Sequence, residues 1–145
     1  MNHKHEQTDA RERLKGARRI VVKVVTSTLT HDTGELNLWR IERLIREIAD
    51  EINAGREIVF VTSGAIAAGR SRTRIKGGSI PEKQALAAVG QGMLMHIYEK
   101  FFAEYGKVPA QILLTGEDAR QNARYLNSRN ALRSEENTSE LQSHA

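Results

Sequence analysis

RIVVKVV, residues 19–25, is the stretch from which the fold can be predicted. A short run of β-branched residues bounded by polar ones is typical of a buried strand in a parallel sheet. EIVFV, residues 57–61, is a second run of the same kind. Between the two runs, apolar residues recur over residues 38–52 with the spacing of one helical face. The pattern predicts a βαβ unit with a right-handed crossover.

Capping residues mark the ends of the expected helices. Asn37 suits the N-cap of the first helix, and Gly55 suits the position just beyond its C-terminus. Ser79 and Glu82 have the spacing of a capping box, which predicts a second helix that runs to about Tyr105. We expect the buried face of this second helix to consist of Leu86, Val89, Met93, Ile97 and Phe101.

Two further segments complete the expected alternation of strands and helices. GRSRTRIKGG, residues 69–78, is basic, rich in glycine and aperiodic, which predicts a mobile loop. VPAQILL, residues 108–114, predicts a third parallel strand, with Pro109 tolerated near its start. TGED, residues 115–118, has the spacing that opens another helix. The order favours an α/β fold whose mostly parallel sheet is covered on both faces.

Length and composition restrict the cellular setting. A chain of 145 residues with 39% hydrophobic content suits one domain. There is no cysteine, no apolar signal segment and no stretch long enough to span a membrane. We therefore expect a cytoplasmic protein without a membrane partner.

The net charge of +4 favours anionic ligands such as nucleotides or phosphates. Much of the excess positive charge lies in Arg11, Arg13, Lys15, Arg18 and Arg19, and we interpret residues 1–16 as a polar, basic N-terminal arm. Only 5% of the residues are aromatic, so the stacking platform of a protein that binds single-stranded nucleic acid is missing. We expect no nucleic-acid partner.

The end of the chain departs from the pattern. RSEENTSELQSH, residues 133–144, has one aliphatic residue and no periodicity. It resembles the in-frame translation of a common sequencing adapter, and an ordinary disordered polar tail is the alternative. We interpret residues 17–132 as the folded domain and residues 133–145 as a non-native polar tail.

Polar residues follow both predicted strands, where ligands of parallel sheets bind. Lys23, near the end of the first strand, either extends to solvent or meets an anion. Thr26 and Ser27 come next and form either a phosphate cradle or a hydroxyl-rich turn. TSGAIAAG, residues 62–69, opens a helix whose N-terminus can bind an anion, although tight helix–sheet packing explains it equally well.

Longer strings in the same order resemble the bacterial glutamate 5-kinases, a branch of the amino-acid kinase family. The resemblance covers residues 13–132 and is carried by IVVKVVTSTLT, NAGREIVFVTSGAIAAG, PEKQALAAVGQGMLMHIYEKFFAEYG, QILLTGED and RYLNSRNAL. It implies the amino-acid kinase fold, an αβα sandwich on a mostly parallel sheet, here truncated. It also implies phosphoryl transfer from Mg-ATP to the side-chain carboxylate of L-glutamate, the first step of proline biosynthesis, by a homo-oligomeric enzyme.

The resemblance also implies roles for individual residues. Lys23 matches the catalytic lysine that contacts the transferring phosphate. Val25, Thr26 and Ser27 match the loop beside the ATP phosphates. Ser63, Gly64 and Ala65 match the glutamate-binding loop, and no metal ligand is assigned.

One departure from the family pattern lies in this machinery. The family has glycine at the position of Val25, and a β-branched side chain there obstructs the approach of a phosphate to the backbone. Later family segments that complete the active site are not in this sequence, so we expect the chain to be inactive alone. The alternatives are another member of the amino-acid kinase family or a non-catalytic nucleotide-binding module, although no G-x-G-x-x-G follows the first strand.

Overall fold

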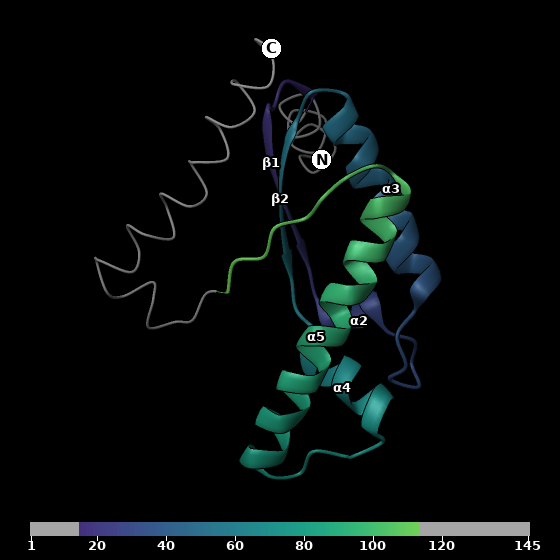
Figure 1. Ribbon diagram of the computed structural model, residues 1–145, viewed down its shortest axis with the longest axis vertical. Coiled ribbons are helices and arrows are strands. Elements are labelled where there is room, and N and C mark those ends of the chain that lie inside the picture. Colours follow the sequence, from purple (N-terminus) through teal and green to yellow (C-terminus); the bar gives the residue numbers. More distant parts are fainter. Residues whose placement is uncertain (1–14, 114–145) are drawn as a thin grey trace, which may run out of the picture. The chain divides into compact units, whose positions relative to one another are not determined.

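The secondary structure alternates between strands and helices, as predicted. The computed structural model describes residues 15–113 of the chain. In order, its elements are β1 (Arg19–Val24), α2 (Thr26–Leu29), α3 (Leu38–Asn53), β2 (Glu57–Thr62), α4 (Ala65–Thr73) and α5 (Ile80–Glu104). The chain divides after Pro109 into two compact units, and all six elements belong to the first unit (Figure 1).

The two strands pair in parallel, which confirms the predicted βαβ unit. The register runs from Arg19 opposite Glu57 to Val24 opposite Thr62. A 2.6 Å ion pair joins the side chains of Arg19 and Glu57 where the strands begin. Both side chains are about half exposed, so this pair adds little stability. Both strands end at the same edge of the sheet.

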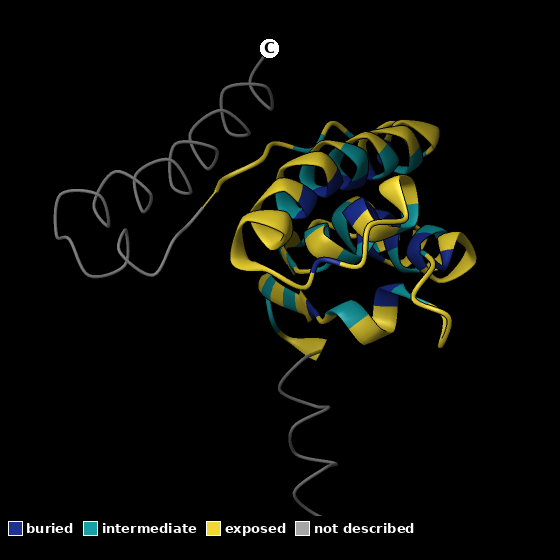
Figure 2. Cartoon of the chain, turned by 90° about the horizontal axis from the view of Figure 1, so that it is seen from below, coloured by how far each residue is buried: buried dark blue, intermediate teal, exposed yellow. Residues whose placement is uncertain are grey.

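Helices cover one face of this sheet. Side chains of Val22, Val24 and Phe60 pack into the core that α3 and α5 close. In Figure 2, the buried residues gather on the inward sides of the helices, whose outer sides are exposed. On the opposite face, Val21 is 62% exposed and Val61 is 43% exposed. The predicted cover on both faces is therefore not present within residues 15–113, because the strands present alternate residues to helices on one side only.

The predicted third strand is wrong for the residues that the structure describes. Residues 108–113 are irregular, and the sheet contains only β1 and β2 within the described region. A β-strand needs a neighbouring strand to which it is hydrogen-bonded. Val108, in contrast, is 97% exposed, and Pro109 has no N–H group to donate to such a neighbour. Four predicted features lie outside the described residues: Leu114 of the third strand, the helix that opens at residues 115–118, the N-terminal arm up to residue 14 and the polar tail.

Helix α3 forms where the apolar periodicity predicts it. Its buried residues, Ile41, Ile45, Ile48 and Ala49, follow one helical face. The side chain of Asn37 accepts a hydrogen bond from the N–H of Arg40, which confirms the predicted N-cap. Gly55 follows the helix with a φ of +84°, a conformation that favours glycine.

Helix α4 occupies part of the segment that the sequence predicts as a loop. Residues 69–73 are helical, and Arg74 ends the helix with a φ of +60°. Gly69, a residue typical of turns, is instead buried inside α4. Only residues 74–78 keep the irregular conformation expected for the loop.

Helix α5 begins at the predicted capping box but buries a different face. Ser79 and Glu82 exchange the two expected hydrogen bonds. The residues that α5 buries are Leu86, Gly90, Leu94, Tyr98 and Phe102. Of the predicted face, Leu86 is buried, and Met93, Ile97 and Phe101 are half-buried against the core. Val89 is 46% exposed, so the fully buried face is shifted by about one position from the predicted one. The cause is Gly90, which a search for large apolar residues passes over.

Glycines bring the backbones of α4 and α5 into contact. A Cβ atom built on Gly90 would lie 1.7 Å from the carbonyl oxygen of Ala65. A Cβ atom on Gly69 would lie 2.1 Å from the carbonyl oxygen of Leu86. Neither position has room for a methyl group, and the obstructing atoms belong to backbone that cannot swing aside. The two helices can therefore cross at this distance only with glycine at both positions.

Gly90→Ala should lower the free energy of unfolding by more than about 2 kcal/mol, because α5 must move away from α4. Gly92→Ala is a matched control on the same helix, since nothing lies within 4 Å of a Cβ at Gly92. That control should be neutral or stabilise by up to about 1 kcal/mol through helix propensity. Urea denaturation of the two variants checks this; equal effects would contradict the close packing.

Candidate functional site

The candidate site lies at the sheet edge where both strands end. Val25 leaves β1 as the N-cap of α2, and Gly64 follows β2 as the N-cap of α4. The N–H of Ser63 donates to the carbonyl of Val24 across 3.2 Å. This bond extends the strand pairing by one step and holds the two turns together.

A hydroxyl pair bridges the two turns. The Oγ1 of Thr26 lies 3.3 Å from the Oγ of Ser63. Ser63 donates its hydroxyl to the carbonyl of Val24 at 3.4 Å, so Thr26 is the donor within the pair. Ser27, the next residue, is exposed. The structure thus brings together two predicted site residues from different strand ends.

Gly64 sets the direction of the second turn. Its φ of +114° is rarely adopted by residues with a side chain. The first hydrogen bond of α4 runs from the N–H of Ala68 to the carbonyl of Gly64. The N–H groups of the first helical turn, which starts at Ala65, precede that bond and have no acceptor within the helix. Helix N-termini of this kind attract negative charge.

Lys23 lies near the same sheet edge, opposite Val61. Its side chain is exposed, on the sheet face that the helices leave open. The sequence predicts one cleft that both Lys23 and Ser63 face. Within the described region, neither residue lines the cavity at Thr26 and α4 or the smaller cavity beside α3 and α5, so that shared cleft stays a prediction.

Val25 sits in a conformation that requires no glycine. Its φ of −94° and ψ of 160° are ordinary extended values, and its side chain is 50% exposed. The valine is therefore unstrained. Its side chain can therefore obstruct a ligand only sterically, by occupying space that a ligand approaching the backbone from solvent would need.

Tyr98, a buried residue of α5, contacts the end of β2 next to the candidate site and was not predicted from the sequence. Its hydroxyl lies 2.6 Å from the Oγ1 of Thr62, the last residue of β2. Thr62 donates its only hydroxyl hydrogen to the carbonyl of Ser63, so Tyr98 is the donor to Thr62. Phe60 packs edge-on against the Tyr98 ring at 5.3 Å. The four-residue spacing from Leu94 is the signal that indicates this buried position.

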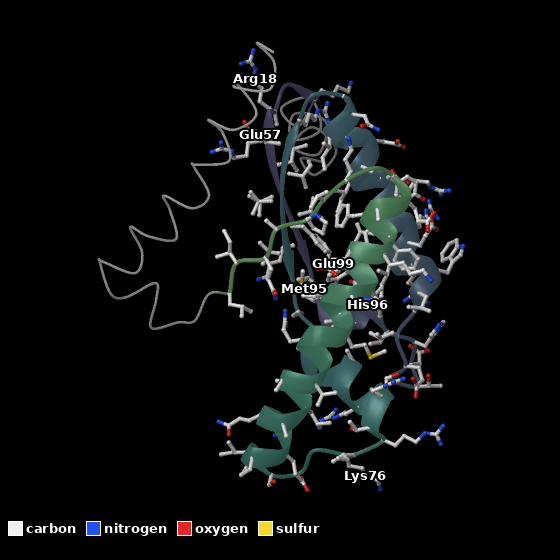
Figure 3. All side chains as sticks on the ribbon, viewed as in Figure 1. Arg18, Glu57, Lys76, Met95, His96 and Glu99 are labelled. Atoms are coloured by element: carbon white, nitrogen blue, oxygen red, sulfur yellow. The ribbon has the colours of Figure 1, made fainter. Side chains whose placement is uncertain are left out.

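A cavity of about 680 Å³ opens beside Thr26. Its cationic lining comes from Arg70, Arg74 and Lys76, in and just after α4. From the sequence, residues 69–78 are predicted to form a mobile loop, so these three cations are not among the predicted site residues. Figure 3 shows Lys76 in the connection between α4 and α5.

The site's chemistry suits an anion better than a bare metal ion. Lysine, hydroxyls and free N–H groups all donate hydrogen bonds. Among residues 15–113, no three His, Cys, Asp or Glu side chains come together as metal ligands. In the same region, no helix is both long enough and apolar enough to cross a membrane.

Comparison with known proteins gives consistent relatives. Residues 18–142 match the amino acid kinase family. A glutamate 5-kinase of Moorella thermoacetica is 58% identical over 128 residues, which are 87% of this chain and 34% of that protein. A glutamate 5-kinase of Carboxydothermus hydrogenoformans is 57% identical over 122 residues, which are 82% of this chain and 33% of that protein. The chain spans about a third of the length of these curated relatives.

Gly64→Ala should destabilise the fold by about 1–3 kcal/mol, because alanine is strained at this positive φ. Ser63→Ala, the neighbouring control, removes two long hydrogen bonds, of 3.3 and 3.4 Å, at an exposed position and should cost less than about 0.5 kcal/mol. Thermal and urea unfolding of both variants measure the difference. If Gly64→Ala were as stable as Ser63→Ala, the turn would not depend on glycine.

Tyr98→Phe should change how stability depends on alkaline pH. Burial raises the pKa of Tyr98 above its ordinary value of 10.0. The Thr62 hydroxyl can turn to donate to the ionised phenol, and this hydrogen bond offsets part of the rise. The folded state favours the neutral phenol, so its contribution is complete below pH 10 and is lost as pH rises through the raised pKa. Tyr98→Phe should cost about 1 kcal/mol at neutral pH and flatten the alkaline decline.

Thr62→Val is the matched control for this prediction, because it removes the hydrogen-bond partner and keeps the ionisable phenol. Its stability should still fall in alkaline solution. Urea midpoints measured from pH 7 to pH 11 compare the variants. An alkaline decline in Tyr98→Phe as steep as in the unchanged chain would show that other groups cause it.

Proposed function

Because the chain belongs to the amino acid kinase family, we propose that it is the N-terminal part of an enzyme that phosphorylates L-glutamate. A carboxylate oxygen of the glutamate side chain attacks the γ-phosphorus of ATP. The bond to the β-phosphate oxygen breaks, which yields ADP and γ-glutamyl phosphate for proline biosynthesis. The observation that carries the proposal is the 57–58% identity to two proteins named glutamate 5-kinase over most of this chain.

We assign the phosphate side of the reaction to the first turn. The ammonium group of Lys23 stabilises negative charge on the transferring phosphoryl group, which is the main catalytic task in such reactions. Thr26 and Ser27 contribute hydroxyl donors for the phosphates of ATP. Val25 lies in the same turn and narrows the approach to its backbone.

We assign the glutamate side to the second turn. Ser63 offers its hydroxyl, while Gly64 and Ala65 offer backbone contacts at the start of α4. The 3.3 Å contact between Thr26 and Ser63 supports this division, because it places the two turns next to each other. Donor and acceptor sites must adjoin for a direct transfer.

ATP is the proposed phosphoryl donor, and Mg²⁺ is proposed as its companion ion. Such an ion neutralises phosphate charge; no described residue is assigned as its ligand. By analogy with the family, we also propose a homo-oligomeric, cytoplasmic enzyme. The 145-residue chain alone is expected to be inactive, because transfer needs groups from several further segments to hold the substrates in line.

A chimera tests the proposal. Residues 18–132 of this chain replace the matching segment of the Moorella thermoacetica protein, and γ-glutamyl phosphate is trapped with hydroxylamine in the presence of Mg-ATP and glutamate. Lys23→Ala in the chimera should lower turnover about 100-fold or more through loss of one electrostatic contact. Val25→Gly should raise turnover by opening the phosphate turn.

Lys83→Ala is the control for the charge change, because Lys83 is exposed in α5 away from the sheet edge. It should leave turnover unchanged. Full turnover of the Lys23→Ala chimera would sink the role of Lys23. Product from the 145-residue chain above that of its own Lys23→Ala variant would contradict the expected inactivity.

A further inference from the structure

The cavity beside Thr26 has a lining that, apart from Thr26 itself, the phosphate and glutamate assignments do not use. Its walls come from α2, the turn before α3, α4 and the segment after α4. The lining combines four hydroxyl side chains, of Thr26, Thr30, Thr33 and Ser71, with three cationic side chains, of Arg70, Arg74 and Lys76. Glu35 is the one carboxylate in the lining, and Gly34, Ala67 and Ile75 complete it. The cavity has a volume of about 680 Å³ and is open to solvent, because most of its lining residues are exposed.

Charge in this cavity is unbalanced. Within residues 15–113, no carboxylate lies within ion-pair distance of Arg70, Arg74 or Lys76. Glu35, the only acid in the lining, already accepts a hydrogen bond from the hydroxyl of Ser71. The cations therefore have no neutralising partner in the described region, and an anion would supply one.

The backbone positions two of these cations. The guanidinium of Arg70 lies against Gly77, with its Nε and Nη2 atoms 3.6 and 3.7 Å from the place of a Cβ atom. Gly77 is buried with a φ of +73°, so the chain turns tightly under this side chain. Arg74 ends α4, and its N–H donates to the carbonyl of Arg70 across 2.7 Å. The end of α4 thus presents both arginines to the same cavity.

We infer that this cavity binds a small anionic molecule that carries carboxylate or phosphate groups. Guanidinium groups recognise both kinds of oxyanion through paired hydrogen bonds. The threonine and serine hydroxyls supply additional donors. The inferred site is separate from Lys23 and Ser63, which do not line the cavity. Thr26 lines it and also contacts Ser63, so an occupant that recruits the Thr26 hydroxyl competes with that contact.

Calorimetric titration of the 145-residue chain at low salt tests the inference, with inorganic phosphate and succinate as separate probes. At least one probe should bind, and the two arms distinguish phosphate from dicarboxylate chemistry. Arg74→Gln should weaken binding at least about tenfold, the effect of losing one charged hydrogen bond. Arg72→Gln is the matched control, because Arg72 is on the same helix but outside the lining. It should change affinity less than about twofold.

Lys76→Gln provides a second variant in the irregular segment, where helix stability is not at stake, and far-UV circular dichroism verifies the fold of each protein. Lys23 lies outside the cavity lining. Loss of probe binding in Lys23→Ala, together with unchanged binding in Arg74→Gln, would place the probe at the proposed kinase site and would overturn the inference. No binding of either probe up to about 10 mM would overturn the inference. Equal weakening by Arg72→Gln, Arg74→Gln and Lys76→Gln would also overturn it, since the attraction would then be diffuse surface charge.

Discussion

The contact between the backbones of α4 and α5 is the constraint on which the rest of the site depends. Gly90 lets α5 pass against the carbonyl of Ala65, which belongs to the first turn of α4. That turn begins immediately after Ser63 and Gly64. The depth at which α5 packs therefore fixes where the second polar turn stands over the sheet edge. A packing contact between two helix backbones thus positions the second turn of the candidate site.

Two hydrogen-bonded links transmit this positioning to the sheet. Tyr98, on α5, donates to Thr62 at the end of β2, and Thr26, at the start of α2, donates to Ser63. The first link is half-buried and fixes the strand end from the core side. The second is exposed and bridges the two turns at the surface. Helix α5, β2 and the turn after β1 consequently act as one support for the site.

Sequence patterns predict most of this architecture where large apolar residues carry the signal. The two strands, α3 with its Asn37 cap and the start of α5 at Ser79 follow from periodicity and capping chemistry. The same reasoning fails at Gly69 and Gly90, because glycine signals turns or weak helices in sequence but here permits close packing inside helices. It also fails at residues 108–113, because strand formation depends on a pairing partner that a local pattern cannot reveal.

Some candidate site residues can likewise be predicted from local sequence patterns, whereas others depend on the tertiary structure. Lys23, Thr26 and Ser63 stand out because they are polar residues directly at strand ends. Arg70, Arg74 and Lys76 do not, because only the helical conformation of α4 and the tight turn at Gly77 direct them toward a common cavity. Contacts formed by distant segments, such as Tyr98 with Thr62, are fixed by tertiary packing and have only an indirect trace in sequence.

The unstrained backbone at Val25 has an evolutionary consequence. Valine and glycine codons differ by a single base in the second position, and a φ of −94° accepts either residue. A change in either direction at this position therefore crosses no intermediate that unfolds the turn. For the proposed phosphate turn, this means that one mutational step is enough to narrow or reopen the approach to the backbone.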